Sequence, residues 1–493
     1  MATTDELPAS ELSRPAWSAE LAGLAAQVAG PILVPGEEGY PAESTGFDLS
    51  VPQRPALIVG ASTTDDVVAA VRFALSHGLF VGVQATGHGP TVAADGGLLI
   101  NTGRMTAIDV DSVNRTARLQ AGTQWTDVIE AAAPFGLAPL SGSAPSVGAV
   151  SYSLGGGIGV LSRRFGFGAD HIRAIEVVTA DGELRRVTAE DSPDLFWAMR
   201  GAGGNFGVVT SIEADLVAVP ELYAGGLFFP GEDRADVLAA FVESVSTAPD
   251  ALSLSVAVYT FPDLPTLPAA VRGRHCCHIR VTHQGSAAEA ESFLGAIRGA
   301  GSVLLDTVRP LPLTEIGTIH NDRTAPLDVH SRSLVLRGLD QGLVDTVIAH
   351  TAPDAASLVE LRHLGGALGR PPVVGNAVGH RGGVANLFTT AYPTDDHTVG
   401  DAEQARLLDD LEPWSDGGAL STFLLGSKVT PADVRAAFRP EDYDRLVQLK
   451  TKWYPGNIFR FNQPARLSGR SPAAPEPRSN GARRRPAHLS RPG

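Results

Sequence analysis

Three glycine-rich stretches, far apart in the chain, constrain its fold more than any other feature. They are residues 84–90 (Gln-Ala-Thr-Gly-His-Gly-Pro), 142–148 (Gly-Ser-Ala-Pro-Ser-Val-Gly) and 155–159 (Gly-Gly-Gly-Ile-Gly). Glycine adopts positive φ and has no side chain to block approach, so such stretches let backbone N–H groups crowd around a negative charge. We therefore expect a fold that brings these bends together around a pyrophosphate.

The composition is that of a large globular protein. The chain has 493 residues, 43% apolar and 19% charged, enough for two or three domains. Its two cysteines, Cys276 and Cys277, are adjacent, which argues against a disulfide framework and fits a reducing compartment. Residues 1–13 lack a signal-peptide pattern and no run of about eighteen apolar residues occurs. We therefore expect a cytoplasmic protein without a membrane partner.

The net charge of −15 is unevenly distributed. Residues 465–493 carry seven arginines against Glu476, so the rest of the chain is at roughly −21 and should repel nucleic acid. Residues 464–493 are rich in Arg, Pro and Ser without apolar periodicity, which predicts a disordered tail. A solvated appendage is favoured over contact of this tail with RNA or a membrane.

The first part of the chain, residues 1–220 with a core at 50–220, is predicted to be a dense α+β domain. A strand at 56–59, a helix capped by Thr63 and ended by Gly78, and a strand at 79–83 form a β-α-β unit that leads into the first glycine bend. Further elements are expected as strands at 116–121 and 208–219, helices at 126–133 and 192–199, and a hairpin turn at 181–182.

Residues 221–435 are predicted to form a second domain, an antiparallel sheet backed by helices. Strand-like runs at 252–259, 278–282, 333–336 and 385–391 alternate with helical stretches at 234–245, 287–298 and 342–350. Few charges fall on these runs, which favours a ring-bearing or aliphatic substrate over a highly charged one. Residues 436–463 read as a helix and a turn that return to the first domain.

Several local motifs resemble known functional signatures but do not meet their requirements. The triple glycine lacks the spacing of a dinucleotide-binding fingerprint, and no Gly-x-Ser-x-Gly nucleophile motif is present. Residues 275–278 (His-Cys-Cys-His) would alternate between the faces of a strand and cannot converge on zinc, so no metal is expected. His88 follows a buried strand between two glycines. Its local sequence suits a cofactor contact and an ordinary turn histidine equally well.

Several motifs, each weak alone, follow one another along the chain in a specific order. They are residues 54–59, 87–88, 95–100, 147–148 with the triple glycine, 200–209, 443–446 and 457–463. Taken together, they resemble the berberine-bridge-enzyme-like branch of the vanillyl-alcohol oxidase superfamily. The resemblance covers residues 54–219 and 439–463.

The resemblance implies an α+β fold with a two-part, PCMH-type FAD-binding domain and an inserted substrate domain. It implies that FAD is bound covalently through His88, by a single tether, because Ala144 stands where many relatives have a second linking cysteine. The residues it places around FAD are Thr86, Gly87, His88, Gly89, Pro90, Thr91, Ser143, Ala144, Val147, Gly148, Ala149, Tyr152, Gly156, Gly157, Gly159, Gly204, Gly207, Val208, Val209 and Asn462.

The same resemblance implies an oxidase that moves a hydride from an alcohol, amine or activated carbon of a natural-product-like small molecule to flavin N5. The small Ala149 leaves room for O2, with H2O2 as product. A cyclase, a dehydrogenase with another acceptor and a non-catalytic flavoprotein that sequesters a ligand remain alternatives. Residues 418–423, where relatives place a base, offer no strong proton acceptor, so the candidates for catalysis are Tyr152, Tyr392 and His380.

Overall fold

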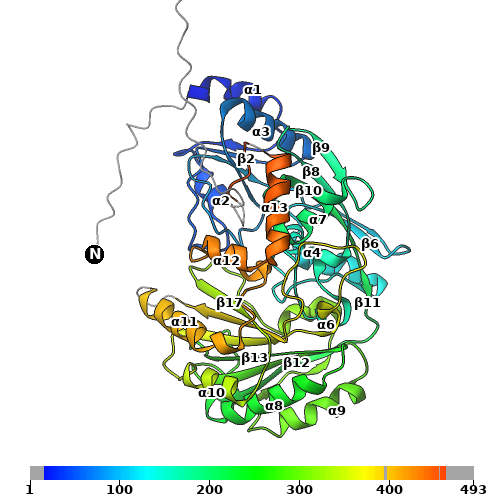
Figure 1. The fold of residues 1–493 in the computed structure, drawn as a ribbon, viewed down its shortest axis with the longest axis vertical. Helices are drawn as coiled ribbons and strands as arrows, with labels where there is room; N and C mark the ends of the chain where they lie inside the picture. Colours follow the sequence, from blue (N-terminus) through cyan, green and yellow to red (C-terminus); the bar gives the residue numbers. More distant parts are fainter. Residues whose placement is uncertain (1–15, 393–396, 455, 462–493) are drawn as a thin grey trace, which may run out of the picture.

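The computed structural model describes residues 16–392, 397–454 and 456–461, drawn as a ribbon in Figure 1. Asn462 and the tail at 464–493 lie outside the described residues. Two parts stack along the long axis of the molecule. The first domain contains β1 to β11 together with the C-terminal helices, and the second contains the large sheet from β12 to β19.

A small, largely parallel sheet opens the first domain. Its strands lie in the order β1 (Ile32–Leu33), β2 (Leu57–Gly60), β4 (Leu98–Asn101) and β3 (Val81–Gln84). The helix α3 (Thr64–His77) joins β2 to β3, begins with a capping box at Thr63 and ends at Gly78, whose φ is 67°. The predicted β-α-β unit is confirmed, although β4 lies between its two strands. Short helices α1 (Leu21–Ala25) and α2 (Tyr40–Ser44) precede this unit.

An antiparallel sheet completes the first domain, with strands in the order β5 (Ile108–Asp111), β6 (Thr116–Gln120), β10 (Val208–Asp215), β8 (Ile172–Val178) and β9 (Leu184–Val187). The hairpin predicted at 181–182 joins β8 to β9. The single strand predicted at 208–219 is wrong in one respect. The chain leaves the sheet after Asp215, and β11 (Val217–Ala218) pairs instead with β7 (Leu137–Ala138).

Four helices of the first domain pack beside these sheets. They are α4 (Trp125–Ala132), α5 (Ala149–Leu154), α6 (Ser162–Phe165) and α7 (Pro193–Ala202). The helices α4 and α7 occupy the regions expected from the sequence. The short α5 was not expected, because its six residues between two glycine stretches carry no helical periodicity of their own.

The second domain is one antiparallel sheet with helices on one face (Figure 1). The strands are ordered β15 (Leu305–Asp306), β12 (Tyr223–Pro230), β14 (His275–His283), β13 (Leu252–Thr260), β18 (Ser357–His363), β19 (Ala385–Ala391) and β17 (His330–Leu336), and β16 (Arg309–Pro310) also pairs with β12. The helices α8 (Arg234–Thr247), α9 (Ala287–Arg298), α10 (Gln341–Ala349) and α11 (Thr398–Asp410) share one apolar core with the sheet. The predicted architecture is therefore present, with β12, β18 and α11 as elements the sequence did not indicate.

The chain then returns to the first domain through α12 (Pro431–Ala436) and α13 (Pro440–Trp453). Val434, Leu446 and Leu449 are buried in the core that contains β2 and β3. The N–H of Val81 donates to the carbonyl of Ile458, which fastens the end of the chain beside β3. In the described part of the chain, no helix is long and apolar enough to cross a membrane.

Arg163 joins the two domains. Its side chain, on α6, is only 4% exposed and donates hydrogen bonds to the carbonyls of Leu252, Leu364, Ala248 and Pro249 in the second domain. A buried carbonyl without a donor costs about 1–3 kcal/mol. The hydrogen bonds to Leu252 and Leu364 are buried, so this side chain stabilises the junction by satisfying their carbonyls.

We expect Arg163→Met to lower the thermal midpoint by several degrees, because it removes these donors together and leaves buried carbonyls unpaired. Arg164→Met is the matched control. Its guanidinium donates to one carbonyl, that of Gln284, so a small change is expected. Differential scanning calorimetry measures both, and equal midpoints for the two variants would contradict this account of the domain junction.

Candidate active site

His88 lies at the first glycine bend, directly after β3. Its ring stacks on Phe47 with centroids 3.9 Å apart, and its Nδ1 is 2.8 Å from the Thr86 hydroxyl. Its Nε2 lies 3.4 Å from the hydroxyl of Ser146, in the second glycine stretch. Burial lowers the pKa of His88 from 6.5 to about 4, so the imidazole is neutral at physiological pH and its orientation is held from two sides.

The backbone beside His88 is packed too closely for any residue except glycine. Gly87 has a φ of 71°, and a Cβ built on it would lie 2.4 Å from the Cα of Gly46. The N–H groups of Phe47 and Asp48 donate to the carbonyls of Thr86 and Gly87, which holds this segment against the bend. Residues 46–48 therefore form a wall of the site that sequence reasoning missed, and no local pattern signals a contact over such a distance in the chain.

Tyr152, on α5, links the second and third glycine stretches. A Cβ on Gly142 or Gly157 would approach its ring to 2.9 Å or 2.6 Å, and Trp125 packs edge-on against it. The hydroxyl is buried and has no hydrogen-bond partner among the described residues. Burial raises the pKa of Tyr152 strongly, opposed by the charge of Arg362. The group is thus a hydrogen-bond donor rather than a ready base.

The segment at 421–426 closes the site from the C-terminal side. The Ser421 hydroxyl donates to the carbonyls of Gly155 and Gly201 at 2.7 and 3.1 Å. The N–H of Gly426 donates to the carbonyl of Pro90, beside His88. Residues 421–423 form a 3₁₀ turn rather than a strand, and they act by tying the glycine bends together.

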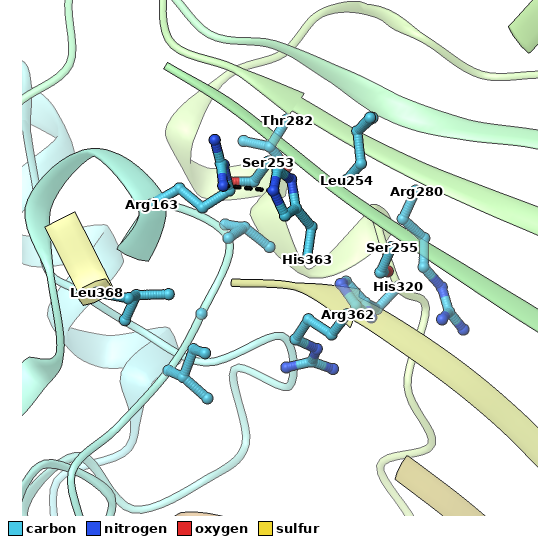
Figure 2. Close-up of a pocket in the computed structure, with 13 residues that line it drawn as sticks. Arg163, Ser253, Leu254, Ser255, Arg280, Thr282, His320, Arg362, His363 and Leu368 are labelled. Carbon is cyan, nitrogen blue, oxygen red and sulfur yellow. Dashed lines mark hydrogen bonds between the residues drawn. The ribbon is translucent and has the colours of Figure 1, made fainter. Parts of the chain in front are cut away.

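The face of the second domain's sheet that is turned away from its helices carries buried charges, most of them drawn in Figure 2. We call Arg280, Glu360, Arg362, Ser255 and His320 the arginine cluster. Arg280 Nη1 lies 3.2 Å from Glu360 Oε1, with both side chains at most 6% exposed, and Arg362 bonds the same carboxylate. The four strand runs predicted from the sequence carry only one charged residue, Arg280, so the prediction of few charges on them is confirmed. Glu360 and Arg362 lie on β18, which was not predicted. This strand was missed, although residues 359–362 (Val-Glu-Leu-Arg) alternate between apolar and polar side chains as in a strand; in the fold this strand is buried along nearly its whole length.

The arginine cluster and the glycine bends meet at Arg362. Its guanidinium lies over the ring of Phe423, 5.3 Å from the centroid, and close enough to Tyr152 to influence its pKa. Tyr392 is also near the cluster. Burial raises its pKa, while Arg323, 5.0 Å from its ring centroid, opposes the shift. Two of the three catalytic candidates therefore flank one group of charges.

His380 does not fit the catalytic role suggested for it. Its Nδ1 is 2.7 Å from Asp416 Oδ2, and its Nε2 is 2.6 Å from the carbonyl of Ala436. Burial lowers the pKa of His380, but the hydrogen bond and charge of Asp416 and the hydrogen bond to Ala436 outweigh it, so the pKa is raised. With both nitrogens engaged, it has no free lone pair to accept a proton from a substrate, and the geometry supports a structural role.

The remaining residues predicted around FAD fall into two groups. Residues 86–91, 143–149 and 156–159 lie in the bends described above. Val208 and Val209 are buried on β10, paired with Val178 and Val177, and a Cβ on Gly207 would lie 2.4 Å from Val177 Cγ2. Their described contacts are those of the core, so a cofactor contact from Gly204, Gly207, Val208 and Val209 stays a prediction. Asn462 lies outside the described residues.

Two clusters resemble metal sites in composition. Residues 275–278 lie on β14, where the strand turns alternate side chains to opposite faces, and both cysteines are buried and free. Asp328, His330 and His397 have ligand atoms within 4.8 Å of one another, but the two imidazoles stack face to face, 3.6 Å apart. Stacked rings direct their in-plane lone pairs side by side rather than at one ion. His330 Nδ1 lies 2.6 Å from Asp401 Oδ1, and His397 Nε2 lies 3.1 Å from Asp328 Oδ1.

The bends are suited to FAD. Glycines leave cradles that a side chain would fill, a neutral imidazole is fixed at their edge, and the buried Tyr152 hydroxyl lacks a partner within the described chain. The family model for the FAD binding domain matches residues 55–188, and the model named "Berberine and berberine like" matches residues 431–466. The chain belongs to the berberine-bridge-enzyme-like FAD-linked oxidoreductases.

Several known proteins are similar to this chain, over part or most of its length. (R)-6-hydroxynicotine oxidase of Paenarthrobacter nicotinovorans is 28% identical over 466 residues, covering 89% of this chain and 98% of the relative. Chitooligosaccharide oxidase of Gibberella zeae is 32% identical over 39% of this chain and 40% of the relative. The wild-type BBE-like 1 protein of Physcomitrella patens superposes with a TM-score of 0.78 at 18% identity, over 91% of this chain and 100% of that one. The predicted fold class is confirmed, and so is the prediction of an FAD-linked oxidoreductase.

We expect Gly87→Ala to lower both the flavin content and the thermal midpoint. Gly96→Ala is the control, because the two glycines have nearly equal φ values of 71° and 69°. An alanine at either position would therefore carry the same strain of a left-handed backbone, about 1–2 kcal/mol. Only Gly87 would clash with a neighbouring backbone, whereas Gly96 has open space around it. Visible absorbance per protein and calorimetry measure the difference. Equal losses in both variants would show that backbone strain alone matters here.

Proposed function

We propose that this chain is an oxidase of a moderately sized alcohol, amine or polyketide, with FAD tethered covalently through His88 alone. When bound, the flavin supplies a hydride acceptor at N5 and, by reaction with O2, a route to H2O2. The orientation of His88, neutral and held between Phe47, Thr86 and Ser146, is the observation that carries the proposal. A covalent bond needs an unprotonated ring nitrogen held in one place, and Ala144 provides no second attachment point.

The substrate class is supported by the relatives and by the position of the second domain. The similar proteins are named as oxidases of 6-hydroxynicotine and of oligosaccharides, which are small molecules with oxidisable carbon next to nitrogen or oxygen. In this chain the sheet of the second domain faces the glycine bends across the arginine cluster. A substrate held between them would lie beside Tyr152. Two buried free thiols also fit our proposal of a cytoplasmic location.

Tyr152 is proposed to donate a hydrogen bond within the loaded site. A buried hydroxyl without a partner costs about 1–3 kcal/mol, so its retention suits a partner that arrives with the cofactor or the substrate. Its raised pKa keeps the proton on the oxygen, and the nearby Arg362 is the charge that opposes this. Tyr392 is the second candidate to contact the substrate, from the other side of the arginine cluster.

The tether is tested by acid precipitation of the purified protein. The wild type should give a yellow pellet, and His88→Ala should release its colour into the supernatant, because no other side chain is proposed to bond the flavin. His77→Ala, at the partly exposed end of α3, is the control and should keep a yellow pellet. Wild-type colour in the supernatant would refute the covalent link while leaving FAD binding intact.

We expect Tyr152→Phe to slow anaerobic flavin reduction by roughly 10- to 100-fold while leaving the thermal midpoint of the flavin-free protein equal or higher. Tyr454→Phe is the control, because its hydroxyl is also buried without a described partner but packs against Phe206 and Phe459 in the core. It should reproduce the effect on stability without the effect on rate. Stopped-flow absorbance and calorimetry measure both. An unchanged reduction rate in Tyr152→Phe would contradict the proposed role.

The acceptor is tested by counting H2O2 formed per substrate consumed. A ratio near one supports the oxidase. A ratio near zero with continued turnover would instead support a dehydrogenase or a cyclase. A flavin that no donor bleaches would support a sequestering role.

A further inference from the structure

The arginine cluster is built by strand register. Ser255 on β13 lies directly opposite both Arg280 on β14 and Arg362 on β18, so two guanidinium groups flank one hydroxyl across three adjacent strands. Side chains opposite one another point to the same face, which here is the face turned from the helices. Figure 2 shows Arg280, Arg362, Ser255 and His320 gathered around the same space.

The charges around this space do not balance. Arg163, Arg280 and Arg362 line it, and Glu360 is the one carboxylate bonded to its arginines among the described residues. Burial and the neighbouring arginines lower the pKa of His320 well below its ordinary value, so this ring adds no charge of its own. The N–H groups of Arg163 are already hydrogen-bonded to backbone carbonyls and to His363 Nε2, none of which carries a negative charge. A positive excess therefore remains in a region from which water is largely excluded.

Arg280 carries the unsatisfied part of that excess. Its side chain is 5% exposed, its one ion pair is through Nη1, and its Nε has no hydrogen-bond partner in the described chain. An ion taken out of water costs several kcal/mol unless opposite charge and hydrogen bonds compensate for it. The Nε and Nη1 atoms of Arg280 both lack hydrogen-bond partners among the described residues, so this guanidinium has donors available for a further anionic group.

We infer that the arginine cluster receives a carboxylate of the substrate, with Arg280 and Arg362 as its cationic partners and Ser255 between them. The cavity has a volume of about 20 Å³, little more than a single water needs, so it would admit the oxygens of a carboxylate and not a ring. The acid group would sit there, and the body of the substrate would extend past Arg362 toward Tyr152 and the glycine bends. This inference rests on the proposed oxidase function and narrows its substrates to those that bear an acid.

The test is isothermal titration calorimetry of the purified holoprotein with benzoate and phenylacetate, each compared with its neutral amide. We expect the carboxylates to bind at least ten-fold more tightly than the amides. Arg280→Met should weaken carboxylate binding by roughly 10- to 100-fold and leave amide binding unchanged, because it removes one buried charge-assisted hydrogen-bond partner. Arg274→Met, exposed just before the same strand, is the control and should bind as the wild type does.

A second variant, Glu360→Gln, tests whether weaker binding by Arg280→Met reflects a lost contact or a damaged fold. It removes the carboxylate that competes for the two arginines, so it should tighten binding of benzoate, a gain that a damaged protein would not show. Equal binding of acid and amide, carboxylate binding that survives Arg280→Met, or no saturable binding in the millimolar range would each overturn the inference. Calorimetry requires no turnover. Retained carboxylate binding with a flavin that no donor reduces would therefore refute the proposed oxidase alone.

Discussion

The close approach of backbone to backbone around His88 is the constraint on which the rest of the site depends. Gly87 contacts Gly46, the N–H of Gly426 reaches the carbonyl of Pro90, and Ser421 joins Gly155 to Gly201. Each contact brings segments together that are distant in the chain, and together they leave cradles lined by main chain. A nucleotide cofactor is held by such N–H groups without competition from side chains. The second domain can then present its sheet to a fixed centre.

That sheet has two faces with different physical tasks. One face is apolar and buried under α8 to α11, and its energy holds the domain together. The other carries Arg280, Glu360 and Arg362, whose burial weakens a fold unless their charges are compensated. Stability is thus supplied on one side, and on our inference specificity on the other, a division that the two-residue period of a strand makes possible. Arg163, on α6 of the first domain, donates hydrogen bonds to carbonyls of the second domain and so joins the two.

Local signals predicted the elements they control directly. Thr63 and Gly78 marked the ends of α3, and Asp181-Gly182 marked a hairpin, because capping and turn chemistry act within a few residues. Sequence alone did not indicate the contact of Phe47 with His88, the role of Ser421, or the charges of β18 beside Arg280. These depend on partners that lie from about forty to more than two hundred residues away, or on strand order, and a local pattern encodes neither. The sequence suggested His380 as a candidate for catalysis, but in the fold its two ring nitrogens are hydrogen-bonded to Asp416 and to the carbonyl of Ala436.

The sequence by itself determined the family, the order of motifs and the position of the imidazole, since glycines and capping residues specify backbone shapes through their own covalent chemistry. Tertiary structure decided the chemical environment of those residues. Burial makes His88 neutral and leaves the Tyr152 hydroxyl without a described partner, and the packing of the two domains brings the charge of Arg362 close enough to act on Tyr152. The reason is that pKa and hydrogen-bond satisfaction depend on the dielectric and on the partners that surround a group, and both exist only once distant strands and bends have packed together.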